Sequence, residues 1–302
     1  MHAFPQARFS NAGNATFPRA HFSDASLLYC PLLRPGKIRF TNTPVVAHLM
    51  PANYLRTLTG KDRSTDANRQ LGYSLAFVAG ATNAGGFLAV KQYTSHMSGV
   101  ISAIADQAAL GDLSLVLAGV GSLISFTLGA GCSAMLVNWG RRRQLHSQYA
   151  SPLLVEAALL LCFGLLGSHL ATWEPFFVPA TVLLLCFIMG LQNAMITKLS
   201  GAEIRTTHMT GIATDIGIEL GKLFYWNCSR DSASAPFVRA NRMKLKVHST
   251  MLCMFFAGGV TGAVGFKHVG YASTVPLSGV LIVLAIVPLL DDLRTQAWRP
   301  DR

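Results

Sequence analysis

Residues 77–84 read FVAGATNA and residues 94–99 read TSHMSG, and both phrases occur again in the second half of the chain. There they read FIMGLQNA at 187–194 and TTHMTG at 206–211. Downstream of each copy, FTLGAGCSA at 126–134 is similar to FFAGGVTGA at 255–263. Chance similarity among apolar segments is common, but a His-Met pair at corresponding places in two weakly similar halves is not. The sequence therefore predicts an internal duplication.

The duplicated region is apolar and nearly free of charge. Of the 302 residues, 51% are hydrophobic and 13% are charged, whereas a soluble domain has about 25% charged residues. A helix needs roughly 20 apolar residues to cross the hydrocarbon core, and the runs here are apolar all round, unlike the amphipathic helices of a soluble bundle. We expect an all-α membrane protein with about six transmembrane helices. Their expected bounds are 71–90, 113–139, 152–172, 175–197, 247–266 and 271–290.

The basic residues predict how these spans are oriented. Cytoplasmic loops of membrane proteins carry an excess of Lys and Arg. If both termini, the arginines at 141–143 and the loop 227–246 lie in the cytoplasm, only Lys91 and Lys267 lie outside. The basic residues behind the net charge of +11 would then set the orientation of the spans and attract anionic lipid. No basic module with interleaved aromatic residues indicates nucleic-acid binding.

Two shorter apolar segments, 94–110 and 206–225, are expected to be re-entrant or interfacial half-helices, one from each face of the membrane. If both crossed, there would be eight spans, and the arginines at 141–143 would lie outside, against the charge rule. With three spans in each copy, the repeats 70–173 and 174–290 must be inverted relative to each other. Inverted repeats with short hydrophobic segments are typical of many transporter folds, whose site lies at the repeat interface.

The ends of the chain differ from the repeats. Residues 1–69 contain scattered prolines and no apolar signal segment, so we expect a disordered cytoplasmic tail. Two alternatives stay open, namely an organellar transit peptide and a translation start at Met50. Residues 291–302 are expected to form a short cytoplasmic tail.

Polar residues at matched positions of the two copies are the first candidates for a binding site. The Thr of the second phrase can cap a helix, and the start of a half-helix inside a membrane favours an anion. Two acidic residues four positions apart share one face of the second half-helix. The candidate substrate-binding residues are Asn83, His96, Asn193, His208, Thr206, Thr210, Asp215 and Glu219.

The alternative interpretation is structural. Amides and imidazoles in membrane helices often hydrogen-bond neighbouring helices, and Glu156, near the start of the third span, is interpreted as facing lipid headgroups. No GxSxG, HExxH or GxxxxGK[ST] pattern occurs, and no two of the six cysteines form a CxxC pair. We therefore expect no enzyme, no cofactor and no metal site. The expected partners are the lipid bilayer, a small solute or ion, and a second copy of the chain in a homo-oligomer.

Several of these phrases also resemble the YoaK family, a group of bacterial inner-membrane proteins of unknown function. The resemblance rests on GxxNA at 80–84, HMSG at 96–99, GLQNA at 190–194 and TTHMTGIATDIG at 206–217, and it covers about 72–290. In the first copy Ser98 and Val100 stand where the family has Thr and Asn, so a role for that Asn is not carried over. The resemblance implies a fold of about six spans in a bacterial plasma membrane, with no established substrate.

Two classes of function are compatible with these patterns. The first is a small-solute or ion transporter or channel with a site between the inverted repeats. The second is a membrane component that transports nothing, such as a sensor, a scaffold or an assembly factor. A water-accessible cavity lined by the matched Asn and His residues would favour the first class.

The predicted orientation can be tested with single cysteines in a cysteine-free background. We expect Gln144→Cys to react with a membrane-impermeant thiol reagent only from the cytoplasmic side, because it follows the arginines at 141–143. Gly270→Cys should react only from the opposite side. Labelling of Gln144→Cys from the outside would contradict both the six spans and the inversion.

Overall fold

The long apolar runs fold into α-helices in the computed structural model, which describes residues 65–145, 147–170, 174–199, 209–225 and 238–297. All of these residues belong to the same unit of the chain, and no strand occurs among them. The helices are α2 (Thr65–Val90), α3 (Met97–Leu110), α4 (Leu113–Arg142), α5 (Ala150–Leu170), α6 (Glu174–Leu199), α7 (Met209–Phe224), α8 (Arg242–Val269), the 3₁₀ turn η2 (Gly270–Ser273) and α9 (Thr274–Ala297).

Each expected span and each expected half-helix overlaps one of these helices, and residues 171–172 and 206–208 of two of them lie outside the described residues. The expected span 271–290 begins in η2, and the expected half-helix 94–110 becomes helical only at Met97. A further boundary differs because the sequence predicts a basic loop as far as residue 246, whereas α8 already begins at Arg242. The side chain of Asn241 explains the early start, since its Oδ1 accepts a hydrogen bond from the Lys244 backbone N–H at 3.0 Å, as an N-cap residue does. Asp112 caps α4 in the same way, through the backbone N–H groups of Ser114 and Leu115.

By length and composition, four stretches of the described helices are able to cross a membrane: Thr65–Val90, Leu113–Arg142, Val178–Lys198 and Arg242–Val287. The last of them contains both α8 and most of α9. Met97–Leu110 and Ala150–Leu165 are apolar but shorter. The described residues thus form an all-helical protein of the membrane-embedded, multi-pass type.

Helix α4 buries small residues and exposes large apolar ones, which is the opposite of what a helix on the surface of a soluble protein does. Its buried residues are mostly small: Ser122, Gly129, Ser133, Val137 and Gly140. Its exposed residues include large apolar ones: Leu115, Leu117, Ile124, Leu128, Met135 and Trp139. In water such a contiguous apolar surface would be costly, whereas in lipid it is solvated and small residues favour close helix packing. Its outer face therefore suits the hydrocarbon of a bilayer.

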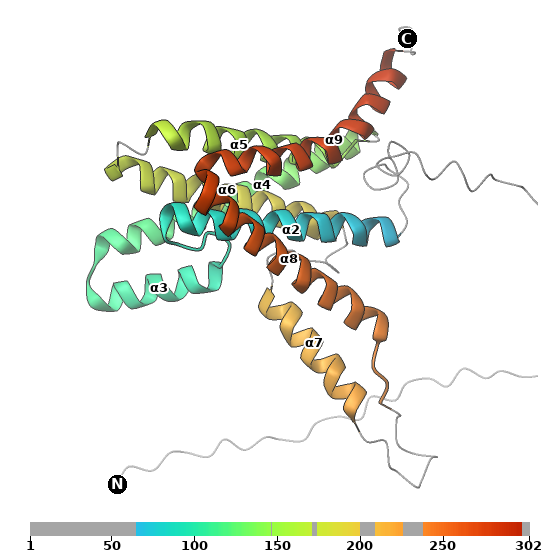
Figure 1. The fold of residues 1–302 in the computed structure, drawn as a ribbon, viewed down its shortest axis with the longest axis horizontal. Helices are drawn as coiled ribbons and strands as arrows, with labels where there is room; N and C mark the ends of the chain where they lie inside the picture. The colour runs from blue at the N-terminus through green and yellow to red at the C-terminus, as the bar shows by residue number, and fades with distance from the viewer. Residues whose placement is uncertain (1–64, 146, 171–173, 200–208, 226–237, 298–302) are drawn as a thin grey trace, which may run out of the picture. The chain divides into compact units, whose positions relative to one another are not determined.

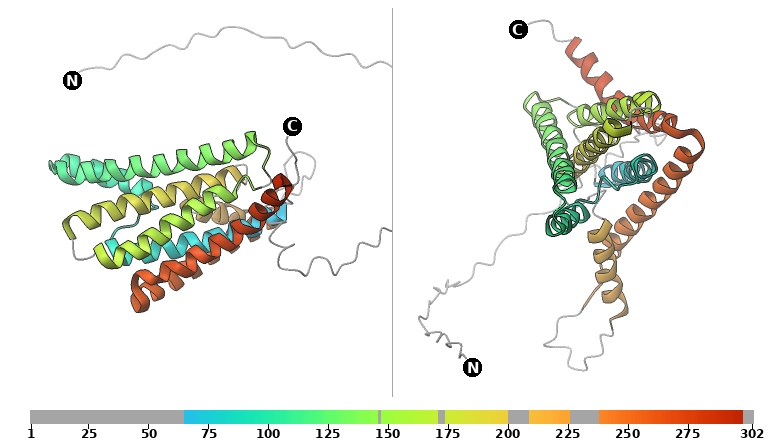
Figure 2. Two further views of the ribbon diagram at one scale, coloured as in Figure 1. Left: turned by 90° about the horizontal axis from the view of Figure 1, so that it is seen from above. Right: turned by 90° about the vertical axis from the view of Figure 1, so that its left-hand side faces the viewer.

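The main helix pairs exchange partners between the two halves of the sequence. Helix α2 packs chiefly against α8, and α4 packs chiefly against α6, while α5 and α9 lie side by side (Figures 1 and 2). The short helices pack on the helices that follow them, α3 on α4 and α7 on α8. The two long pairs therefore each join one half of the chain to the other.

The α2–α8 pair is in backbone contact at a Phe-x-x-Gly phrase of each helix. A Cβ atom on Gly80 would overlap the carbonyl oxygen of Phe255, and one on Gly258 would overlap that of Phe77. Only glycine permits an approach this close.

The α4–α6 pair repeats this contact. A Cβ on Gly129 would overlap the carbonyl oxygen of Phe187, and one on Gly190 would overlap that of Phe126. The four phrases, at 77–80, 126–129, 187–190 and 255–258, are those that the sequence comparison matched between the copies. The duplicated phrases are thus the crossing points of the fold.

Helices α2 and α6 carry the first phrase of each copy and bury it in the same way. Residues 71–87 and 181–197 have the same order of buried and half-buried positions, apart from residues 73 and 183. The two helices run in opposite directions (Figures 1 and 2). They are joined by a hydrogen bond of 3.3 Å from Gln192 Nε2 to the carbonyl oxygen of Leu75.

The crossing contact makes a prediction about two neighbouring glycines of α4. Gly129→Ala should lower the free energy of unfolding by about 1–3 kcal/mol, because its methyl group must push the α6 backbone away. Gly131→Ala is the matched control: a Cβ there meets nothing within 4 Å, so it should be neutral or raise stability by up to about 1 kcal/mol. Unfolding of each purified variant in detergent measures the difference, and equal effects would contradict the crossing.

Candidate functional site

Asn83 holds the two phrases of the first copy together. It is half-buried on α2, and its Oδ1 accepts a hydrogen bond of 2.8 Å from Ser95 Oγ, in the loop before α3. The amide therefore fixes the start of the short helix relative to α2. This contact fits the structural interpretation of Asn83.

His96 lies at the position preceding α3, and its side chain makes no capping hydrogen bond. Its ring lies over Gly99, where a Cβ atom would be 2.8 Å from His96 Nδ1. The glycine that ends the phrase TSHMSG thus makes room for the histidine that precedes it. A side chain at residue 99 would have to displace the ring.

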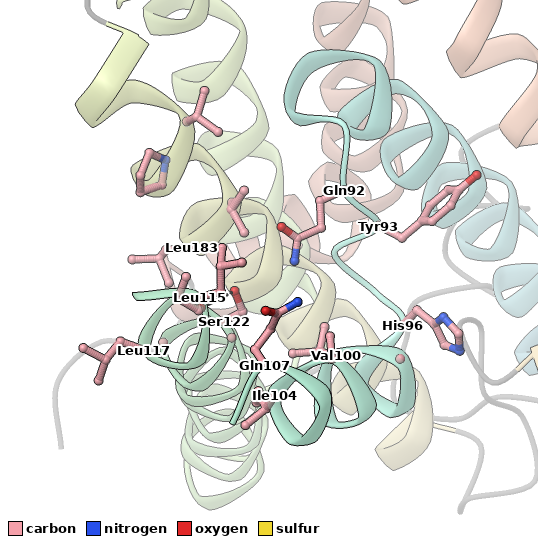
Figure 3. A pocket seen from close by; sticks show the side chains of 18 residues that line it. Gln92, Tyr93, His96, Val100, Ile104, Gln107, Leu115, Leu117, Ser122 and Leu183 are labelled. Atoms are coloured by element: carbon pink, nitrogen blue, oxygen red, sulfur yellow. Dashed lines mark hydrogen bonds between the residues drawn. The ribbon is translucent and has the colours of Figure 1, made fainter. Parts of the chain in front are cut away.

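A pocket of about 560 Å³ opens between α3, α4 and α6, and we refer to it as the α3–α4 pocket. Its lining is mainly apolar, with polar groups from Gln92, Tyr93, His96, Gln107 and Ser122. The amide ends of Gln92 and Gln107 point toward each other, while the ring of His96 points away from them (Figure 3). The pocket therefore offers amide, hydroxyl and imidazole groups for hydrogen bonding within a mainly apolar lining.

Asn193, the counterpart of Asn83, is half-buried on α6. Its Oδ1 is buried and has no hydrogen-bond partner among the residues that the structure describes, and its carbonyl oxygen accepts from Thr197 Oγ1 at 2.7 Å. The second phrase of this copy begins outside the described residues. The predicted site residues Thr206 and His208 lie outside the described residues, so their role in a binding site stays a prediction.

The other three candidates lie on α7. Thr210 is exposed in its first turn, and its carbonyl oxygen accepts a hydrogen bond from Thr214 Oγ1. Glu219 is buried and accepts hydrogen bonds from Lys222 Nζ at 2.9 Å and from the Asn241 backbone N–H at 2.6 Å. Glu219 therefore ties α7 to the start of α8.

These two contacts also affect the ionisation of Glu219, on a helix that is not among the stretches able to cross a membrane. The hydrogen bond from Lys222, followed by that from the Asn241 backbone, holds the pKa of Glu219 below its ordinary value. Glu219 is thus stabilised as a carboxylate, and its two oxygens are already occupied by the protein.

Asp215 lines a second pocket, of about 360 Å³, at the start of α8. We call it the α7–α8 pocket, and its lining residues are Arg69, Asp215, Asn241, Met243, Lys244, Val247 and His248. Asp215 Oδ1 lies 3.1 Å from Lys244 Nζ, and its Oδ2 lies 3.7 Å from His248 Nε2. This pocket, in contrast with the first, is lined by ionisable groups from α2, α7 and α8.

The predicted site residues are thus divided between different places. His96 lines the α3–α4 pocket and Asp215 lines the α7–α8 pocket, while Asn83 and Asn193 line neither. Because His208 is not described, a single cavity lined by the matched residues stays a prediction. No group of three His, Cys, Asp or Glu side chains in the described part of the chain is placed to hold a metal ion.

Three members of the α7–α8 pocket are not among the site residues that the sequence predicts. Arg69 and Lys244 lie in basic segments that served only to predict topology, and no pattern pointed to His248. An alignment of the two copies would have pointed to His248. Gly119 and His248 stand at the same distance before FTLG and FFAG, so the alignment places a histidine opposite a glycine.

Glu156 lies in the interior and not at the headgroups, so its interpretation from the sequence is wrong. Its side chain on α5 is fully buried, and neither carboxylate oxygen has a hydrogen-bond partner among the described residues. Its position on the face of α5 that carries Leu153, Ala157 and Leu160, all buried, explains why nearness to the helix start did not bring it to the surface.

One comparison with known proteins gave a match. The model of a family described as "Protein of unknown function (DUF1275)" matches residues 71–287. No curated protein and no solved structure gives a significant match. The matched residues contain both copies of the duplicated phrases and every lining residue of the two pockets except Arg69.

The contacts of Glu219 predict a pH dependence. Because its pKa is lowered in the folded state, its contribution to stability is present above its unfolded pKa of about 4.3 and is lost as the pH falls through the folded-state value. Glu219→Gln should therefore lower the melting temperature at pH 7, with a difference that shrinks below about pH 4.3. Asp106→Asn, exposed on α3, is the control and should have no effect. A difference independent of pH would contradict the assignment.

Proposed function

Since the chain belongs to the DUF1275 family, to which YoaK-like proteins also belong, and since that family has no assigned function, we propose a function from the geometry of the helices. The protein is a small-solute or ion transporter or channel, built from two inverted three-span repeats, with its site between them. It resides in the bacterial inner membrane with both termini in the cytoplasm. The prediction of the family from the sequence is confirmed by this match.

The exchange of partners between the halves is the observation that carries this proposal. If a two-fold axis relates the copies, α2 corresponds to α6 and α8 corresponds to α4, so the α2–α8 contact must recur as α6–α4. That recurrence is found, with Gly and Phe in reciprocal contact at both crossings. The opposite directions of α2 and α6 (Figure 2) favour an axis in the membrane plane, the symmetry of many transporters.

The short helices support a site at the repeat interface. With 14 and 16 residues, α3 and α7 extend about 21 and 24 Å, less than the roughly 30 Å of the hydrocarbon core. Each closes a pocket with the next helix and with a helix of the other copy: α3 with α4 and α6, and α7 with α8 and α2. Short helices that face pockets shared by both copies fit a transport pathway better than a scaffold.

The lengths of the helices support the proposed count of six spans. The stretch Arg242–Val287 has 46 residues and would be about 69 Å long as one helix, more than twice the hydrocarbon thickness. It is interrupted at η2, where Gly270 has a φ of +63°. Two crossings, α8 and α9, together with α2, α4 and α6, would make five, and the 21 residues of α5, about 31 Å long, would add the sixth.

One observation favours the alternative, a membrane component that transports nothing. Asn83 is engaged with Ser95, and it lines neither of the described pockets. Polar residues that only join helices would serve a sensor, a scaffold or an assembly factor equally well.

A cysteine at Asn193 separates the two classes. In a transporter, Asn193→Cys in a cysteine-free background should react with an impermeant thiol reagent from both faces of the membrane, because a midplane site opens to each side in turn. Met195→Cys, fully buried two residues further on, gives the background rate. Reaction from one face only, or none above that background, would contradict transport and favour the alternative.

A further inference from the structure

The two pockets occupy equivalent places in the two copies. Matching the phrases TSHMSG with TTHMTG, FTLG with FFAG, and FVAG with FIMG aligns α3 with α7, α4 with α8, and α6 with α2. The N-caps agree with this register, because Asp112 and Asn241 stand at the same distance before the Phe of FTLG and FFAG. The α3–α4 pocket and the α7–α8 pocket are thus formed by corresponding helices of the two copies.

Four corresponding lining positions differ in polarity between the two pockets. In the α3–α4 pocket they hold apolar residues, and in the α7–α8 pocket they hold ionisable ones. The corresponding pairs are Ala103 and Asp215, Leu115 and Lys244, Gly119 and His248, and Pro179 and Arg69. The same helix arrangement therefore forms without charges at these places, so helix packing alone does not require them.

From this contrast we infer that the α7–α8 pocket binds a small oxyanion, a phosphate or carboxylate group, through Arg69, Lys244 and His248. Asp215 occupies the place of the anion while the pocket is empty. Binding in this pocket is independent of whether the anion crosses the membrane. Only the comparison between the pockets rests on the duplication proposed above.

The polar groups of the pocket match such a ligand. Lys244 Nζ is held 3.1 Å from a carboxylate oxygen of Asp215, which is itself an oxyanion. His248 is buried, and its Nδ1 has no hydrogen-bond partner in the described part of the chain. A buried polar group without a partner is costly. Nε2 of the same ring lies 3.7 Å from Asp215 Oδ2, too far for a hydrogen bond, so a ligand oxygen in the place of Asp215 would give this imidazole a partner.

Two further features add positive potential. Arg69 Nη1 lies 3.0 Å from Asp66, whose side chain is 78% exposed, so that pair is weak and leaves the guanidinium able to bind a second acid. The pocket also lies at the start of α8, a helix of 28 residues, where the helix dipole favours an anion. An oxyanion in the pocket would displace Asp215 from Lys244 and contact all three basic groups.

Two sources could supply this chemistry, a dissolved anion or the phosphodiester headgroup of an anionic lipid. The full chain, purified in detergent, is titrated with inorganic phosphate and, separately, with a short-chain phosphatidylglycerol, at constant ionic strength. Lys244→Gln should weaken binding of whichever probe is the ligand at least about tenfold, as expected for loss of a charge-assisted hydrogen bond. Lys246→Gln, exposed on the same helix and absent from the pocket lining, is the matched control and should leave the affinity unchanged.

Asp215→Asn tests the displacement directly. Removing the competing carboxylate should tighten binding by roughly threefold or more, whereas a purely structural Asp215–Lys244 pair predicts lower stability with no gain in affinity. This variant keeps the test decisive if Lys244→Gln does not fold. The inference is overturned if neither probe binds, if Lys246→Gln weakens binding as much as Lys244→Gln, or if Asp215→Asn does not tighten it. Because no transport is measured, its failure is distinguishable from failure of the transporter proposal.

Discussion

Backbone contact at the Phe-x-x-Gly phrases is the constraint on which the other features of the fold depend. Gly80 and Gly258 bring α2 against α8, and Gly129 and Gly190 bring α4 against α6. The short helices pack on α4 and α8, so their position relative to the other copy is set by these crossings. In lipid, where apolar side chains gain little by association, such close approach is a principal source of helix affinity. The two pockets exist because the crossings place a helix of each copy beside a short helix of the other.

Much of this architecture could be predicted from the sequence, because the signals are local. The lengths of the apolar runs predicted the helices, and the repeated phrases contain the residues at which the long helices cross. The caps were harder to predict, since Asn241 starts α8 within a stretch that its charges made look like a loop. Glu156 was misplaced because burial depends on which neighbours cover a helix face, and that information is absent from the helix itself.

The residues that line the two pockets were harder to predict than the helices, for the same reason. Asn83 and His96 attract attention because their residue types recur, but a recurring residue can also serve to fix a turn, as the Ser95 hydrogen bond and the Gly99 contact do in the first copy. The residues that make the α7–α8 pocket unlike its counterpart do not recur. In a protein with two similar copies, positions where the copies agree indicate residues that maintain the shared fold. Positions where they differ indicate residues with a role in one copy only.

The glycine crossings also have a mechanical consequence. At each crossing the two backbones touch directly at the glycines, so a change in the angle between the helices moves this point least and the helix ends most. Each crossing therefore acts as a fulcrum. A change of tilt about the α2–α8 fulcrum would move the N-terminal ends of both helices, which carry Arg69 and Lys244, and would alter the width of the space between them.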